Sequence, residues 1–185
     1  MYEGMSRRGG HEEKDGKLSE LFLLGRVKVN NPDYEKGIKK CTGKIGEAYW
    51  DCAIKVIKEF QPYDPINPQK RFPRDLRRVF VEEAGIKDEK KVKIFTMVDS
   101  VVDLGKKMDA FIEVDDEKPG MNLVSFNHKR VDNENDIDGY LGADVLIPII
   151  PDPEEGLEDY ENIIRQLGKS AAKVYLSRQQ QQTSH

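Results

Sequence analysis

Four polar residues near the middle of the chain have the types and spacing of a site that handles charge. Asp109 stands at the start of one extended segment, and Ser125, Asn127 and Lys129 alternate along another. Because the side chains of a strand point alternately to its two faces, the last three share one face. Carboxylate and amide oxygens are hard ligands for cations such as Mg²⁺, and a lysine ammonium counters negative charge. A turn between the two segments would bring these groups together.

The sequence around these residues predicts that turn. Apolar residues alternate along Ala110–Val114, and Leu123–Val131 is again extended. Between them, Asp115–Asn122 contains Pro119 and Gly120, which is typical of a hairpin turn. We therefore expect two antiparallel neighbouring strands, with Asp109 at the start of the first.

The remaining elements follow from the periodicity of apolar residues. Spacings of three and four residues predict helices over Thr42 to about Phe60, with Thr42 as N-cap, over Arg74–Ala84, and over Glu154 to about Ser177. Two further strands are expected at Val92–Val98 and Ala143–Ile150, and the second is so apolar that we place it near the sheet centre. The fold class is α/β (α+β), with a central mixed four-stranded sheet flanked by helices in the order ααββββα.

Residues 18–41 allow two interpretations. A short helix ended by Gly25 fits the apolar run before it, whereas Val27 and Val29 alternate with basic residues as in a strand.

Three short segments, taken with this order of elements, resemble the PD-(D/E)XK nuclease superfamily. They are residues 43–47 (GKIGE), 107–112 (KMDAFI) and 126–129 (FNHK). The resemblance implies a restriction endonuclease-like fold over roughly residues 42–176.

The resemblance also implies a role for each matching residue. Asp109 and Asn127 fall at the positions that bind a divalent cation, Mg²⁺ or Mn²⁺, and Lys129 at the position that orients or activates the attacking water. Glu47, in the first helix, falls at an assisting position. These residue types suit phosphodiester cleavage, which uses hard oxygen ligands and a nearby cation. Asn127 departs from the family pattern, because an amide replaces the acidic ligand and brings no charge to the metal.

Two functions therefore remain open, with a third beyond the resemblance. The first is a metal-dependent phosphodiesterase that acts on nucleic acid, with DNA favoured over RNA, in phage or mobile-element biology. The second is a catalytically inactive nuclease-fold protein that binds nucleic acid or a protein partner. The third is an unrelated α+β interaction module.

Each candidate residue also has a structural interpretation. Asp109 could be a turn residue, Lys129 could solvate an edge strand, and Glu47 could stabilise the start of its helix through the macrodipole. His128 alternates away from Asn127, which predicts no catalytic role for it. The acidic stretch Asp132–Gly139 is expected to be a solvated loop rather than a calcium site.

Composition limits the nature of any partner. The chain has 30 Lys and Arg against 34 Asp and Glu, a formal net charge of −4, so no overall basic field attracts nucleic acid. Binding would have to be local. The most basic stretch is residues 70–93, whose charges could track phosphates or simply solvate a helix.

The organisation of the chain is that of one intracellular domain. We expect a disordered N-terminal segment at 1–17, a single domain at 18–178 and a disordered polar tail at 179–185. Cys41 and Cys52 form no CxxC pair, which favours reduced thiols. No signal peptide or membrane span is evident, so we expect a cytoplasmic protein, and a homodimer is compatible with the sequence.

Overall fold

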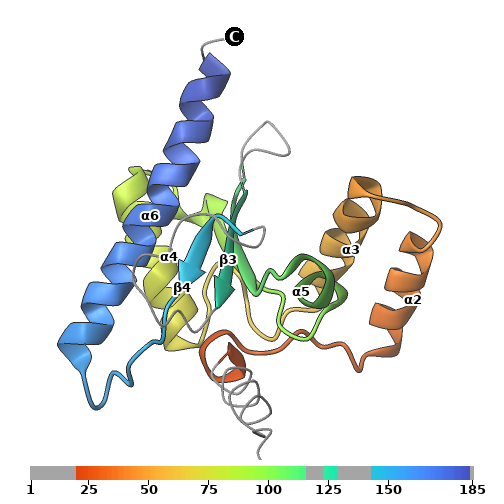
Figure 1. Cartoon of the computed structure of the whole chain (residues 1–185), viewed down its shortest axis with the longest axis horizontal. Helices are drawn as coiled ribbons and strands as arrows, with labels where there is room; N and C mark the ends of the chain where they lie inside the picture. Colours follow the sequence, from red (N-terminus) through yellow and green to blue (C-terminus); the bar gives the residue numbers. More distant parts are fainter. Residues whose placement is uncertain (1–19, 116–122, 129–142, 184–185) are drawn as a thin grey trace, which may run out of the picture.

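The computed structural model describes residues 20–115, 123–128 and 143–183 (Figure 1). These residues form an α+β fold in which helices flank a four-stranded mixed sheet. The predicted segment at 1–17, most of the predicted hairpin turn and the acidic loop at 132–139 lie outside them. Within the described ranges, no helix combines the length and the apolar character that crossing a membrane requires.

The sheet is built from strands in their chain order. These are β1 (Val92–Thr96), β2 (Ala110–Val114), β3 (Leu123–His128) and β4 (Val145–Ile147). Strands β1, β2 and β3 are antiparallel neighbours, whereas β4 runs parallel to β3. The predicted hairpin is therefore confirmed, with Ala110 of β2 opposite Phe126 of β3.

Strand β4 corrects the prediction for Ala143–Ile150. Only Val145–Ile147 forms a strand, and it lies at the edge of the described sheet rather than near its centre. Pro148, directly after the strand, has no backbone N–H to continue the ladder. The apolar run is nevertheless buried, because Val145 and Ile147 pack into the core that α6 covers. Strand β4 is therefore buried on both of its faces although it has a neighbouring strand on only one side of the described sheet.

One face of the sheet is covered by α4 (Arg71–Ala84) and α6 (Leu157–Thr183), the pair at the left of Figure 1. Helix α4 begins three residues earlier than predicted, because Pro73 lies in its first turn, where no backbone donor is needed. Helix α6 continues through residues 179–183, which the sequence predicts as part of a disordered tail. The two helices approach closely at Gly168, where a Cβ would lie 2.8 Å from the Cβ of Val79.

The other face carries a second core beneath three helices at the right of Figure 1. These are α2 (Pro32–Cys41), α3 (Glu47–Glu59) and α5 (Val101–Lys106). Phe95 of β1 and Phe111 of β2 stack in this core with ring centroids 4.8 Å apart. Helix α5 was not predicted, since six residues are too few to show periodicity. It is fixed by the side chain of Ser100, which accepts hydrogen bonds from two amides of its first turn.

Residues 20–24 are helical and the helix ends at Gly25, whose φ is 78°, so the helix interpretation of the ambiguous segment is confirmed; α2 then corrects the predicted start of α3. No strand forms at Val27 or Val29. Instead the Asn31 side chain accepts from the Asp33 amide, and Pro32 occupies the first turn of α2. Thr42 is consequently the C-cap of α2, with its hydroxyl donating to the Lys39 carbonyl, and not the N-cap of α3.

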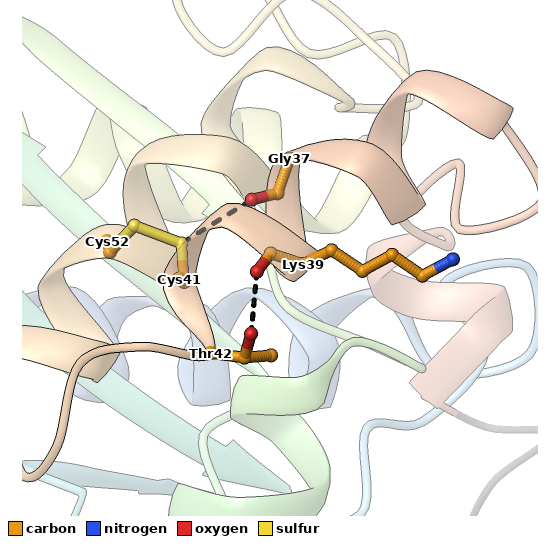
Figure 2. Close-up of a disulfide and its surroundings, with 5 residues drawn as sticks. All are labelled: Gly37, Lys39, Cys41, Thr42 and Cys52. Carbon is orange, nitrogen blue, oxygen red and sulfur yellow. Dashed lines mark hydrogen bonds between the residues drawn. A yellow bond between two sulfur atoms is a disulfide. The ribbon is translucent and has the colours of Figure 1, made fainter.

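Cys41 and Cys52 form a disulfide, so the prediction of reduced thiols is wrong (Figure 2). The sequence argument placed Cys52 in one long helix from Thr42. In the structure, Cys41 ends α2, and the packing of α2 on α3 brings the two Cα atoms to 5.7 Å. That separation is typical of a disulfide. The missed helix boundary hid the pairing.

Candidate active site at the end of the β2–β3 hairpin

Asp109 is fixed by backbone hydrogen bonds to the strands on both sides of it. It directly precedes β2, and its amide donates to the Phe126 carbonyl of β3 at 2.9 Å. On the other side its carbonyl accepts from the amide of Met97, which follows β1, at 2.7 Å. The position of Asp109 is therefore set by the sheet itself rather than by a free loop.

Asn127 lies beside Asp109 at the same end of the hairpin. It follows Phe126 in β3 and is paired with Leu146 of β4. Phe111 and Ser125 are opposite each other, so period-two alternation places Asp109 and Asn127 on their face, which is the face of α3 and α5. Both are buried, with 3% of Asp109 and 7% of Asn127 exposed. The structure thus brings together two of the four predicted residues.

Glu47 occupies a different environment. Its side chain is 81% exposed and forms an ion pair with the Nζ of Lys106 at 2.8 Å. The same ammonium lies 5.4 Å from the centre of the Trp50 ring, and Gly105 packs so closely on Trp50 that no Cβ would fit. The start of α3 is thereby attached to the end of α5. Glu47 reaches the segment that leads into Asp109 through Lys106, three residues before it.

Lys129, the predicted catalytic cation, lies outside the described residues, as does the side chain of His128. Their predicted roles therefore stay predictions.

Asp109 and Asn127 together could supply some of the oxygen ligands that a divalent cation requires. Mg²⁺ is held by oxygen ligands, often one or two carboxylates with water and substrate oxygens completing an octahedron. Asp109 could supply a carboxylate oxygen and Asn127 an amide oxygen. Among the residues that the structure describes, no three His, Cys, Asp or Glu side chains gather where they could hold a metal ion. The described residues therefore offer one charged and one neutral oxygen ligand at this position.

A second acidic residue near the hairpin was not found from the sequence. Asp144 accepts hydrogen bonds from the amide and the hydroxyl of Ser125, each at 2.9 Å. The guanidinium of Arg178, near the end of α6, binds both the Asp144 carboxylate and the Leu123 carbonyl. This network ties α6 to β3 and to the start of β4. Asp144 and Arg178 are 34 residues apart, and no local pattern connects them.

Two residues of the basic stretch at 70–93 are bound to backbone carbonyls of the fold. Arg77 is buried, and its guanidinium donates to the carbonyls of Val92 and Glu89. Lys70 donates to the carbonyls of Leu21 and Phe22. These contacts favour the structural interpretation for Arg77 and Lys70.

Comparison of the chain with protein-family models, curated proteins and solved structures found no match. The candidate site therefore rests on its own residues. Asp109 and Asn127 carry it, because the sheet holds them side by side at buried positions.

Proposed function

We propose that the protein is a metal-dependent phosphodiesterase that acts on DNA, with a restriction endonuclease-like core. The single observation that carries the proposal is the 2.9 Å hydrogen bond from the Asp109 amide to the Phe126 carbonyl. It places a carboxylate beside Asn127 at the end of two adjacent strands, as the resemblance to the PD-(D/E)XK superfamily implies.

The proposed roles follow from the chemistry of each group. Hydrolysis forms a bond from a water oxygen to phosphorus and breaks the bond to the leaving oxygen. A bound Mg²⁺ or Mn²⁺ supplies charge neutralisation at the phosphate and acidifies the attacking water. Asp109 and Asn127 hold the cation, and the Lys129 ammonium orients the water and offsets the developing negative charge. Glu47 assists from the edge of the site through Lys106.

A second function is favoured by a specific observation. Asn127 brings no charge, and only 3% of Asp109 and 7% of Asn127 are exposed. A neutral, buried amide lowers the affinity for a cation. The second candidate is therefore an inactive nuclease-fold protein that binds nucleic acid or a protein partner.

A cleavage assay separates the two candidates. Plasmid and single-stranded DNA are incubated with the protein while Mg²⁺ or Mn²⁺ is titrated. The proposal predicts metal-dependent cleavage that Asp109→Ala and Lys129→Ala each reduce by about 100-fold or more. Asp33→Ala and Lys36→Ala are matched controls, because they remove the same side-chain types from an exposed ion pair on α2.

The controls should cleave as the unchanged protein does. Absence of metal-dependent cleavage, or cleavage that survives both site substitutions, would refute the phosphodiesterase. DNA binding without cleavage would instead support the second candidate.

A further inference from the structure

The disulfide that Figure 2 shows joins Cys41 and Cys52, and these two residues differ in their exposure to solvent. Cys41, the last residue of α2, is completely buried, with 0% of its surface exposed. Cys52, in the second turn of α3, is half-buried. A reagent in solution therefore reaches the bond from the side of Cys52. Access decides which sulfur of a disulfide a thiolate attacks.

The surroundings of Cys41 also suit the reduced state. Its Sγ lies 3.6 Å from the Gly37 carbonyl oxygen, one helical turn earlier. A disulfide sulfur has no hydrogen to donate, whereas a thiol at the same place would donate to that carbonyl. The position at the C-terminus of α2 further favours the neutral thiol over the thiolate. Reduced Cys41 therefore fits its site without a change of backbone.

Helix α2 also keeps contacts with α3 that do not depend on the bond. The Tyr34 ring meets Phe60 edge to face, with centroids 5.7 Å apart. Gly37 lies so close to α3 that a Cβ there would be 2.7 Å from Cγ1 of Val56. These contacts preserve the approach of the two helices when the sulfurs separate. The bond can then close again between the same partners.

We propose that Cys41 and Cys52 form a thiol–disulfide exchange site, which acts as a reversible clasp between α2 and α3. A thiolate of an external dithiol attacks the Sγ of Cys52. The S–S bond breaks, and its electron pair leaves with the Sγ of Cys41, which takes a proton from solvent. The second thiol of the dithiol then attacks the mixed disulfide and releases Cys52 as a thiol. The dithiol ends as a disulfide, and a disulfide oxidant reverses the process.

The direction of attack can be tested with two single-cysteine variants. Cys41→Ala leaves Cys52 and Cys52→Ala leaves Cys41, and each is exposed to glutathione disulfide without denaturant. Mass spectrometry follows the mixed disulfide. The half-buried Cys52 is expected to react at least about 100-fold faster than Cys41, whose reaction requires local opening. Equal rates would overturn the assignment. Reaction of both cysteines in denaturant checks that each thiol is intact.

The clasp itself is tested on the unchanged full-length chain. Dithiothreitol without denaturant is expected to produce two alkylatable thiols, and oxidised dithiothreitol to remove them again. Amides of α2 should then exchange with deuterium faster in the reduced state, while those of α4 serve as an internal reference and keep their rates. Reduction that occurs only in denaturant, or unchanged exchange in α2, would show that the bond is a fixed structural link.

Discussion

Asp109 and Asp144 lie on adjacent parts of the sheet, but their carboxylates have different surroundings. Asp144 is neutralised by Arg178 and accepts two hydrogen bonds from Ser125, so its charge serves to hold α6 on the sheet. Asp109 lies opposite Asn127 in the hairpin, on the face that α3 and α5 cover. Asp109 is therefore the acidic residue to test for metal binding, because it is the one placed beside Asn127.

The sequence could identify Asp109 and Asn127 because both depend on one local hairpin. Strand alternation and a short turn determine which residues of two successive strands are neighbours. Arg178 could not be found in this way, because its partner is set by the packing of α6. Glu47 was placed in the correct helix, but its ion pair with Lys106 depends on α5, which has no sequence signal of its own.

Tyr160 allows a pH-dependent test at the residue scale. Its hydroxyl donates to the Asp75 carboxylate at 3.1 Å, and burial, followed by the Asp75 charge, raises the pKa of Tyr160 above the usual 10.0. The folded state therefore keeps the phenol protonated at a pH where the unfolded chain ionises it. The resulting stability is complete below about pH 10 and is lost as the pH rises through the raised pKa.

Tyr160→Phe should lower the free energy of unfolding by about 1 kcal/mol at pH 7, because the hydrogen bond is lost. Above pH 10 its stability should fall less steeply than that of the unchanged protein. Urea unfolding between pH 7 and pH 11 measures both effects. Identical slopes for the two proteins in the alkaline range would contradict the assigned environment of Tyr160.

At the element scale, the helices with long amphipathic patterns were predicted better than their ends. Helices α3, α4 and α6 occur where the periodicity places them, with shifted boundaries. The boundary between α2 and α3 was missed because Thr42, a residue favoured at N-caps, is here the C-cap of α2. Gly46, at a φ of 57°, directly precedes α3 and marks the true break.

Gly168 tests the packing of α6 on α4. A Cβ at this position would lie 2.8 Å from the Cβ of Val79, so Gly168→Ala should overpack the interface at a cost of about 1–3 kcal/mol. That cost outweighs the roughly 1 kcal/mol by which alanine favours the helix. With Val79→Ala as background, the overlap with Cγ1 of Val79 disappears while the Cβ–Cβ approach remains, so Gly168→Ala should cost clearly less than in the unchanged protein. Urea unfolding of the four proteins gives the coupling energy, and equal effects of Gly168→Ala in both backgrounds would rule out the close contact.

The disulfide makes a separate contribution to stability. It closes a loop between residues 11 apart, which in the chain-entropy treatment stabilises the fold by about 3 kcal/mol. Replacing both Cys41 and Cys52 with alanine should therefore lower Tm by about 6–12 °C. Calorimetry of the variant and of the reduced unchanged protein checks the value. If the variant and the oxidised protein have the same Tm, the prediction is wrong, because the disulfide then does not restrict the unfolded chain.

At the scale of the whole molecule, the sheet separates two cores of different origin. The core under α4 and α6 was predictable from apolar periodicity, since long helices cover one face of the sheet. The core under α2, α3 and α5 was not, because two of these helices are short and depend on caps and on the disulfide. The placement of β4 at an edge was missed for a related reason: apolar composition reports burial but not the number of neighbouring strands.

The candidate site lies between the sheet and the core under α2, α3 and α5. Asp109 and Asn127 belong to the sheet and face the second core, while Glu47 approaches them through α5. The positions of Asp109 and Asn127 could be predicted from the sequence, whereas the approach of α3 to them could not. The site is therefore defined most firmly at its two buried polar residues, and they should decide whether a cation binds.

Direct measurement of Mn²⁺ binding by isothermal titration calorimetry tests this claim without requiring a substrate. The unchanged protein is expected to bind one Mn²⁺ weakly, and Asp109→Asn to lose the binding. Asn127→Asp should tighten it by about tenfold or more, a gain of about 1.4 kcal/mol from the added charge. Asp33→Asn, on the exposed surface of α2, is the matched control and should change nothing. No binding in either the unchanged protein or Asn127→Asp, or binding that Asp109→Asn leaves intact, would contradict the metal site.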